Sequence, residues 1–498
     1  MTTRKSPLRR IAAAVSALAL VGASAVAFSA PASAEGQPSL PDKATGSITL
    51  HKHAEASGSS DTKPAGPALG GIRFTYQEVG QKVNGTCTEI DLSTTEGWAL
   101  AKLVVDGFNK TTGVLGNDTC LIGTPTNFPL TSSADDATKG TTQANYLPIG
   151  LYFINETDPG DHLVSQSIPF LATVPMLNDD KVSWNYDLVA YPKNKIEKNE
   201  PSKTIQGNSG TQPLLPGATL NWTITVPLPK LKFGYNVIEI TDVMTGDHDS
   251  LTFGEVKLGA TTLDSSSHYT VTGNVLKFEG PGLAEVNLLS KTQGQTLTIK
   301  VTTKVKALAD PATLTNKADV KLNAKTESTG IPRSYWGEIT ILKHEQGDTA
   351  KTLEGAKFNV YALTAATCQE SVDAVGATPL VTGLTTGPGG TISQVLWVAN
   401  ADTVPANPLT RTYCIVETQA PAGFILDSAA RTVTLSTSTT EANPALTWGE
   451  KVPNSKPSSG ELPLTGAGGT LAMTVSGLVL MGAGAGAIAV SRRRSHKA

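Results

Sequence analysis

Charged residues, aromatic residues and cysteines are all scarce in this chain of 498 residues. Charged side chains make up 17% and hydrophobic side chains 39%, and both shares are low for a compact enzyme. The formal net charge of −3 provides no basic surface, so a nucleic-acid partner is not expected. The residue types that are plentiful instead, Thr, Ser, Gly, Val and Asn, favour short strands and turns over long helices.

The motifs of common catalytic and metal sites are missing as well. No GxSxG or HExxH occurs, and the glycine-rich stretch Gly387–Gly390 is not followed by the Lys-Ser/Thr of a P-loop. His51 and His53 would share one face of a strand, but no third ligand is implied, so we expect no metal site and no cofactor. The chain is therefore not predicted to be an enzyme.

The four cysteines fall into two pairs along the chain. Four cysteines allow three pairings. The simplest pairing joins Cys87 to Cys120 and Cys368 to Cys414. Each bridge would contribute about 3–4 kcal/mol in the chain-entropy estimate for loops of this length. A zinc site is a poor alternative, because the sequence contains no CxxC pair.

Residues 1–34 have the pattern of a secretory signal peptide. Four basic residues precede the small-residue apolar run IAAAVSALALVGASAVAF, and Ala32–Ala34 form a cleavage site before Glu35. A signal anchor is the weaker alternative, because it would not need this cleavage site. The mature chain is therefore expected outside the cytoplasm, where disulfides are stable.

The C-terminal end combines four features in a fixed order. Residues 457–469 form a Pro/Ser/Gly linker that ends in an LPLTG motif, 470–490 are uncharged and long enough to cross a bilayer, and 491–498 form a basic tail. Positive charge stays inside, so everything upstream is expected outside. The motif itself consists of Leu462, Pro463, Leu464, Thr465 and Gly466.

This order resembles the cell-wall sorting signal of Gram-positive surface proteins. In that family a sortase cysteine attacks the Thr–Gly bond, which is Thr465–Gly466 here, and passes the threonyl group to an amine. LPxTG alone is a weak signal, whereas the four-part arrangement is a strong one. The resemblance implies peptidoglycan and a housekeeping sortase as partners.

A second motif lies far upstream, in WNYDLVAYPKN at Trp184–Asn194. Alternating apolar residues up to Ala190 predict a strand that Pro192 ends, and Lys193 is expected just past that end with an exposed amine. The stretch resembles the pilin motif of sortase-assembled pilus shaft subunits. Trp184, Tyr191, Pro192 and Lys193 match that motif, while Leu188 and Ala190 replace valines. The resemblance implies that Lys193 of one molecule is joined to Thr465 of the next by a pilin-specific sortase.

Three segments near the start of the chain recur near its end in the same order. GSITLHKH, GIRFTYQEV and GLYFINET are echoed by GEITILKH, GAKFNVYAL and RTYCIVET. The repeat predicts two copies of one β-fold around a middle segment of alternating strands. We therefore expect an all-β chain of three tandem immunoglobulin-like sandwich domains, at 35–195, 196–331 and 332–456, with an insertion in the first domain around Cys87–Cys120.

This layout resembles the major shaft pilins of Actinomyces and Corynebacterium, with collagen-adhesin B-like outer domains and an A-like middle domain. Such domains often carry a bond between a Lys amine and an Asn side chain, formed beside a buried carboxyl group. In the third domain the resemblance implies a bond between Lys343 and Asn454 with Glu417, which lies in a stretch that resembles the pilin E-box. In the middle domain it implies Lys203, Asn316 and Asp242, with Lys198 as a competitor for Lys203.

The first domain has Lys52 and Glu156 in positions that match those of the third. Its asparagine is left open among Asn178, Asn185 and Asn194, so the sequence does not decide whether this domain carries a bond.

The sequence is compatible with three functions. The first is the structural shaft subunit of a covalent pilus, polymerised by sortase with other copies of itself and then anchored to the wall. The second is a wall-anchored monomeric adhesin that binds host matrix or glycans, and it differs from the first only in the role of Lys193. The third, a wall-anchored hydrolase, lacks a catalytic constellation. The sequence leaves open a tip adhesin subunit, a host ligand and the cognate sortase.

Overall fold

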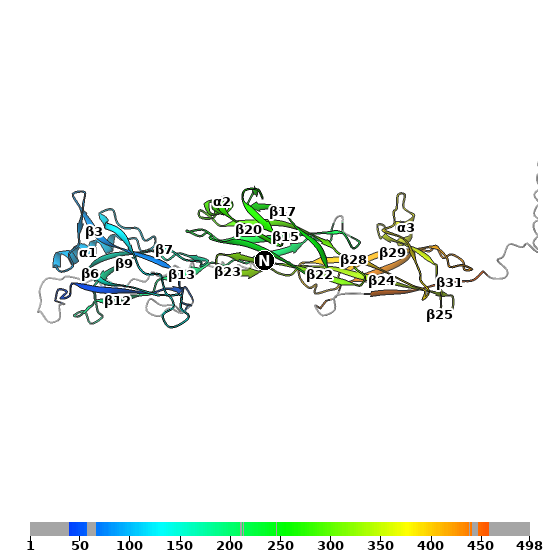
Figure 1. Ribbon diagram of the computed structural model, residues 1–498, viewed down its shortest axis with the longest axis horizontal. Coiled ribbons are helices and arrows are strands. Elements are labelled where there is room, and N and C mark those ends of the chain that lie inside the picture. Colours follow the sequence, from blue (N-terminus) through cyan, green and yellow to red (C-terminus); the bar gives the residue numbers. More distant parts are fainter. Residues whose placement is uncertain are drawn as a thin grey trace, which may run out of the picture.

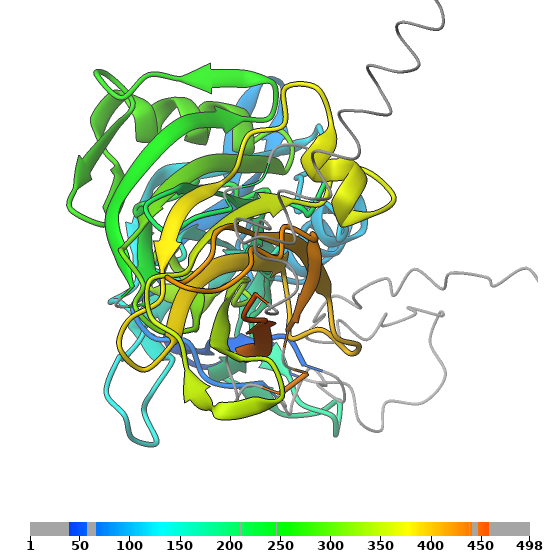
Figure 2. The ribbon, with the colours of Figure 1, turned by 90° about the vertical axis from the view of Figure 1, so that its right-hand side faces the viewer.

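The computed structural model describes residues 39–56, 66–209, 212, 214–245, 247–437, 439–440 and 447–457. The predicted signal peptide, the LPLTG motif with Thr465, and the apolar segment 470–490 lie outside these residues. Within them, the structure contains no helix that is long and apolar enough to cross a membrane. The described chain is mainly β and forms three groups of strands along one long axis (Figure 1). Seen from one end, the groups lie one behind another (Figure 2).

The first group, here the first unit, extends from β1 to β13. Its strands are β1 (Thr45–His51), β2 (His53–Ala54), β3 (Arg73–Val83), β4 (Thr86–Glu89), β5 (Thr119–Asn127), β6 (Thr141–Pro148), β7 (Gly150–Asp158), β8 (Val164–Ser165), β9 (Phe170–Val174), β10 (Met176–Leu177), β11 (Trp184–Asn185), β12 (Asp187–Ala190) and β13 (Lys193–Ile196). One sheet has the order β4-β3-β7-β9, with β5 also paired to β3, and the facing strands form the small sheets β12-β1-β6 and β2-β13-β8. Ile48, Leu50, Phe74 and Ile154 are buried between them. Strands of alternating burial thus enclose one apolar core.

The expected insertion of the first unit contains β4, β5 and a helix, α1 (Thr95–Gly107). The Thr94 hydroxyl caps this helix by accepting a hydrogen bond from the Gly97 amide. A second, small apolar cluster, which includes Val79, Ala101 and Val104, packs the helix against the sheet. The predicted Cys87–Cys120 disulfide is present and ties β4 to β5.

The middle unit consists of β14 to β23 and one helix. Its elements are β14 (Ser202–Ile205), β15 (Thr219–Leu228), β16 (Ile238–Met244), β17 (His248–Leu258), β18 (Thr261–Leu263), β19 (Tyr269–Thr272), β20 (Val275–Phe278), α2 (Gly280–Ser290), β21 (Gln295–Val305), β22 (Ala312–Leu322) and β23 (Lys325–Ser328). A sheet of order β14-β15-β21-β17-β18 faces one of order β19-β20-β16-β22. The core between them includes Trp222, Ile224, Ile240 and Val320.

The third unit consists of β24 to β31. Its elements are β24 (Arg333–Glu345), β25 (Asp348–Thr352), β26 (Lys357–Ala362), α3 (Cys368–Asp373), β27 (Val381–Thr385), β28 (Thr391–Ala401), β29 (Thr410–Gln419), β30 (Arg431–Ser436) and β31 (Thr447–Asn454). The sheet β27-β26-β29-β30 covers β24 and its neighbours, and the core includes Ile339, Ile341, Phe358 and Ile415. The predicted Cys368–Cys414 disulfide joins α3 to β29.

One sheet continues from the middle unit into the third. Residues 312–315 of β22 pair with 333–336 of β24, and β24 then pairs with β28 and with β31. Trp336 and Trp397 belong to the core of the middle unit even though their strands belong to the third. These two units therefore share backbone hydrogen bonds as well as side-chain packing.

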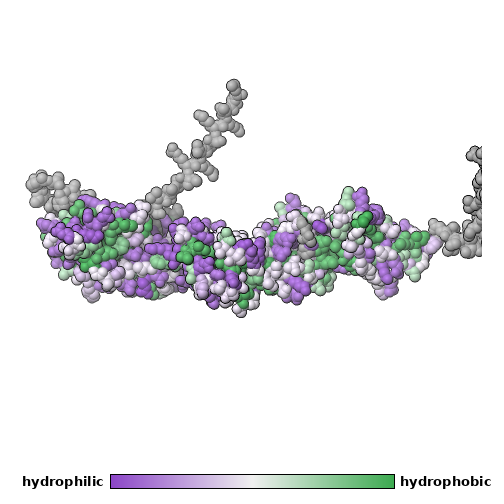
Figure 3. All heavy atoms as spheres, turned by 90° about the horizontal axis from the view of Figure 1, so that it is seen from above, coloured by the Kyte–Doolittle hydropathy of each residue, from purple (hydrophilic) through white to green (hydrophobic). Residues whose placement is uncertain are grey.

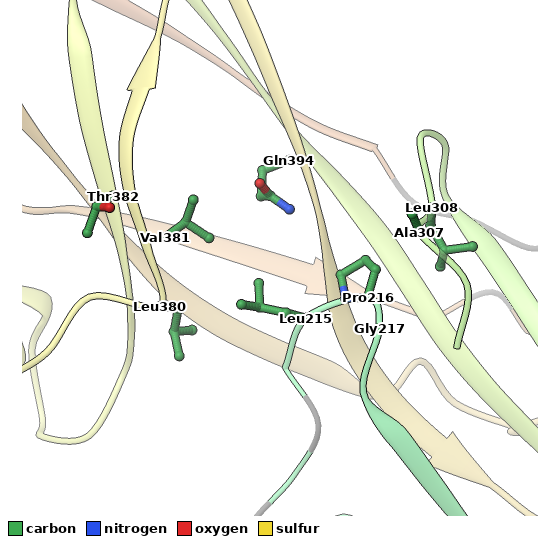
Figure 4. A pocket seen from close by; sticks show the side chains of 9 residues that line it. All are labelled: Leu215, Pro216, Gly217, Ala307, Leu308, Leu380, Val381, Thr382 and Gln394. Atoms are coloured by element: carbon green, nitrogen blue, oxygen red, sulfur yellow. The ribbon is translucent and has the colours of Figure 1, made fainter. Parts of the chain in front are cut away.

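A pocket at the same junction is lined by residues of both units. The lining residues are Leu215, Pro216, Gly217, Ala307, Leu308, Leu380, Val381, Thr382 and Gln394 (Figure 4). None of them is charged or nucleophilic beyond the Thr382 hydroxyl, so this pocket offers no constellation for catalysis. On the face drawn in Figure 3, hydrophilic and hydrophobic residues are interspersed along the whole rod.

Candidate functional site

A buried lysine, glutamate and asparagine meet in the core of the third unit. The Lys343 ammonium donates hydrogen bonds to the Asn454 side-chain oxygen and lies 3.1 Å from Glu417 Oε1. The Asn454 amide nitrogen donates to Glu417 Oε1 over 3.0 Å. Lys343 is 0% exposed, and both partners are 2% exposed. Because β31 lies parallel to β24, the end of the last strand is placed beside the first.

The first unit contains the same arrangement. The Lys52 ammonium donates to Glu156 Oε2 over 2.8 Å and to the side-chain oxygen of Asn194. The Asn194 amide nitrogen donates to Glu156 Oε1, also over 2.8 Å. All three residues are 0–1% exposed. Here too the last strand runs parallel to a strand near the start of the unit, since β13 pairs with β2, which directly follows Lys52.

The structure selects Asn194 from the three asparagines that the sequence left open as the partner of Lys52. Of the other two candidates, Asn178 donates to the Ser183 hydroxyl and Asn185 accepts from the Asp187 amide, and both residues are only half-buried. Only the packing of β13 beside β2 selects Asn194. The sequence feature that could have identified Asn194 is its place in the repeat. Asn194 lies at the end of the first unit, as Asn454 lies at the end of the third.

The middle unit brings Lys203, Asp242 and Asn316 into one buried region. Lys203 on β14 donates to the Asp242 carboxylate on β16, and it also reaches the Lys317 carbonyl at 3.3 Å. Asn316 on β22 is 0% exposed, and its side-chain atoms make no hydrogen bond of normal geometry. Lys198, the competing candidate, is exposed and lies outside this region.

Burial lowers the pKa of the three lysines and thereby favours the neutral amine. Burial lowers the pKa of Lys52 to about 8 and that of Lys203 to about 8, although the neighbouring carboxylates oppose the shift. The pKa of Lys343 is lowered for the same reason. Each amine also lies over an aromatic ring: Phe74 at 5.4 Å, Trp222 at 5.8 Å and Phe358 at 5.7 Å.

Burial also raises the pKa of Asp242, although the Lys203 ammonium opposes the shift. The lysine and the carboxyl group are thus both pushed towards their neutral forms. A proton that moves from Lys203 to Asp242 would leave a nucleophilic amine next to a carboxylic acid, the combination that acid–base catalysis needs.

In the two outer clusters the carboxylate contacts the lysine nitrogen and the asparagine amide nitrogen. Bond formation requires a proton to move from the first of these nitrogens to the second. Attack of the lysine nitrogen on the asparagine carbonyl carbon forms a C–N bond and leaves a proton on that nitrogen. Glu156 and Glu417 can accept this proton and return it to the asparagine amide nitrogen, which departs as ammonia. The arrangement is therefore suited to forming an isopeptide bond without another enzyme.

Lys193 lies just past a strand end, as predicted, but it also begins a new strand. The strand expected over residues 184–190 is divided into β11 and β12, β12 ends at Ala190, and Lys193 is the first residue of β13. Pro192 has no amide hydrogen and interrupts the ladder, but its carbonyl still accepts from the His53 amide over 3.1 Å. The Lys193 side chain is half-buried instead of fully exposed.

The aromatic residues of the motif hold its surroundings in place. The Trp184 indole stacks on Trp98 of α1, with ring centroids 4.8 Å apart, and donates to the Ser39 carbonyl over 2.7 Å. Tyr191 stacks on His51 with centroids 5.2 Å apart. The motif is therefore tied to the insertion, to the N-terminal segment and to β1.

Comparison with known proteins shows which sequences and structures this chain resembles. Residues 43–195 match the N-terminal domain D1 of Gram-positive pilin subunits, and residues 454–497 match the LPXTG cell wall anchor motif. The chain is 30% identical to the fimbrial subunit type 2 of Actinomyces naeslundii, over 100% of this chain and 99% of that protein. It is 27% identical to the fimbrial subunit type 1 of Actinomyces viscosus, over 100% and 99%. Among solved structures, the major pilin SpaD of Corynebacterium diphtheriae matches 83% of this chain and 98% of that chain, with 23% identity and a TM-score of 0.46.

Proposed function

Because this chain belongs to the family of Gram-positive fimbrial subunits, we propose that a sortase joins its Thr465 to Lys193 of the next copy. The chain is a structural subunit of an extracellular fimbria that a sortase attaches to the cell wall through the LPXTG motif, and it is not an enzyme. The proposal adds the two linked residues, a pilin-specific sortase for polymerisation and a housekeeping sortase for the final transfer to peptidoglycan.

The rigid placement of Lys193 is the observation that supports this linkage. Lys193 lies on β13 between β2 and β8, and the next residue, Asn194, is locked in the buried cluster. Lys193 itself pairs with His53 of β2, and later residues of the strand, Lys195 and Ile196, pair with β8. An acceptor amine on a backbone held in this way loses less conformational freedom when it reacts. The partly exposed side chain still projects away from the core.

We further propose that the three buried clusters form isopeptide bonds: Lys52 with Asn194, Lys203 with Asn316, and Lys343 with Asn454. The contacts, the complete burial and the lowered lysine pKa values support this chemistry. In the third unit the bond would join the first and last strands, so tension along the chain would bypass the sheet hydrogen bonds between them. The domains proposed to carry the bonds cover 35–195, 196–331 and 332–456.

The test of the linkage is an immunoblot of wall extracts boiled in SDS. Wild-type cells should show a ladder of high-mass species, and Lys193→Ala should abolish it. Lys195→Ala is the matched control, because Lys195 lies on the same strand and is more exposed, and it should leave the ladder unchanged. A single band from wild-type cells would instead indicate a wall-anchored monomer, and a ladder that survives Lys193→Ala would refute the assigned acceptor.

A further inference from the structure

The outward face of β13 places a histidine beside Lys193. Side chains alternate along β13, so that Asn194 points into the core and Lys193 points away from it. The same alternation holds on the neighbouring segment, where Lys52 is buried and His53 is only partly buried. Lys193 and His53 are direct partners in the parallel ladder between β13 and β2. Neighbouring strands are about 4.8 Å apart, which lets the two outward side chains meet.

The hydrogen bonds of His53 determine which ring nitrogen can accept a proton. His53 Nδ1 lies 2.9 Å from the Gly66 carbonyl oxygen. A carbonyl oxygen can only accept, so Nδ1 carries the hydrogen and Nε2 carries the lone pair of the neutral ring. The backbone of His53 is also held against the segment that carries Lys193, since the His53 amide donates to the Pro192 carbonyl.

A second pair of side chains lies one step along the same face. His51 stacks on Tyr191, and His51 Nδ1 is 2.9 Å from the Thr141 hydroxyl. The pair Tyr191–His51 and the pair Lys193–His53 are thus successive rungs between the same two segments. The stack holds the segment that carries Lys193 against the segment that carries His53.

We propose that His53 is the proton acceptor for Lys193 when Lys193 attacks the sortase-bound threonyl group. This inference rests on the proposed function of Lys193. The neutral Lys193 amine adds to the thioester carbonyl carbon, and its nitrogen becomes positively charged as the C–N bond forms. His53 Nε2 removes one proton from that nitrogen. The C–S bond then breaks, the proton passes to the departing thiolate, and the products are an amide and a free thiol.

The experiment measures the reactivity of Lys193 with a small thioester, without sortase. The full chain is purified unpolymerised from cells that lack the polymerising sortase and is treated with phenyl thioacetate. Peptide mass spectrometry then gives the acetylation rates of Lys193 and of Lys195 in the same molecules. Lys195 is the internal reference, because its side chain is 66% exposed on the same strand.

Two variants separate the base from the structure around it. His53→Asn keeps an amide donor for the Gly66 carbonyl and lacks Nε2, and it should lower the Lys193/Lys195 rate ratio about a hundredfold, the low end of general-base effects. His53→Ala should show the same loss, and added imidazole should restore much of it. His162→Asn is the matched control, because His162 also contacts a backbone carbonyl in the first unit, and it should leave the ratio unchanged.

The outcomes distinguish this inference from the proposed function. An unchanged ratio in His53→Asn, or a loss in His53→Ala that imidazole does not restore, would overturn the role of His53. A pilus ladder that persists in Lys193→Ala would overturn the linkage, whereas the thioester measurement would still report on His53. If either His53→Asn or His53→Ala melts well below the wild type, the conclusion is drawn from the other variant.

Discussion

Asn194, which contacts Lys52 and Glu156 in the core, directly follows Lys193 on β13. The proposed internal bond and the proposed link between subunits would therefore start from adjacent residues whose side chains point in opposite directions. Locking one residue restricts the backbone of the other.

Removal of this lock should loosen the acceptor strand. In Asn194→Ala, amide hydrogen exchange of residues 193–196 should become at least tenfold faster, because β13 then depends on short pairings with β2 and β8. Exchange in the third unit should not change. Asn178→Ala is the control, since its side chain bonds only to exposed Ser183. Equal protection of β13 in Asn194→Ala and wild type would show that the cluster does not hold the strand.

Each proposed isopeptide bond should remove one ammonia from the mass of the mature chain. Three bonds predict a deficit of about 51 Da, or about 17 Da for each bond, relative to the oxidised sequence. Glu156→Ala, Asp242→Ala and Glu417→Ala should each restore about 17 Da, because each removes the group that carries the proton. Intact-mass and cross-linked-peptide spectrometry test this. A wild-type chain without any deficit would refute all three bonds. A smaller deficit would give the number of missing bonds, and the cross-linked peptides would identify them.

Loss of the bond in the third unit should lower stability strongly. Lys343 and Asn454 are 111 positions apart, and a cross-link that closes a loop of this length stabilises a fold by about 4–5 kcal/mol in the chain-entropy estimate. Lys343→Met removes the nucleophile while filling the apolar site, so most of its effect should come from the lost bond. Calorimetry should show a lower melting temperature for one transition. Lys351→Met, at a position that is largely exposed, should melt as the wild type does.

An unbonded first unit should become more stable as pH rises. In Asn194→Ala, Lys52 stays free, with a folded-state pKa lowered by burial to about 8 against an ordinary value near 10.5. The unfolded chain then binds more protons between these two values, so the free energy of unfolding rises from pH 8 to pH 10.5 and is lowest below pH 8. The gain between pH 8 and 9.5 should be on the order of 2 kcal/mol.

Urea denaturation at pH 7, 8 and 9.5 measures this dependence. The double variant Lys52→Met, Asn194→Ala lacks the titrating amine and should lose the difference, while its other lysines still titrate. Parallel pH dependence in the two variants would contradict a buried, readily deprotonated Lys52.

The sequence carries the strand pattern and most of the buried clusters. The repeated GSITLHKH and GEITILKH segments place Lys52 and Lys343 at equivalent strand positions, and the two ET dipeptides do the same for Glu156 and Glu417. The sequence pattern could not choose among Asn178, Asn185 and Asn194, because that choice depends on which later strand packs in parallel beside the segment that carries Lys52. Nor could the sequence show that Lys193 begins a strand, since Lys193 pairs with His53, which lies 140 positions away.

Helix α1 was also not predicted from the sequence. It has no counterpart in the repeat, and only Gly97, Ala101 and Val104 are buried on it, so its apolar face is weak. The sequence signal for the start of this helix is local, because Thr94 is its N-terminal cap. The stacking of Trp98 on Trp184 could not be anticipated, because tertiary packing alone brings these two side chains together.

The position of β13 has a consequence for a fibre assembled in this way. A covalent path that enters a subunit at Lys193 continues along the chain towards Thr465 without passing through residues 39–192. The first unit would then be a side branch of the polymer and not a link in it. A protease that cut within β3 or the α1 insertion would leave the fibre at full length, whereas a cut just after Ile196 would sever it.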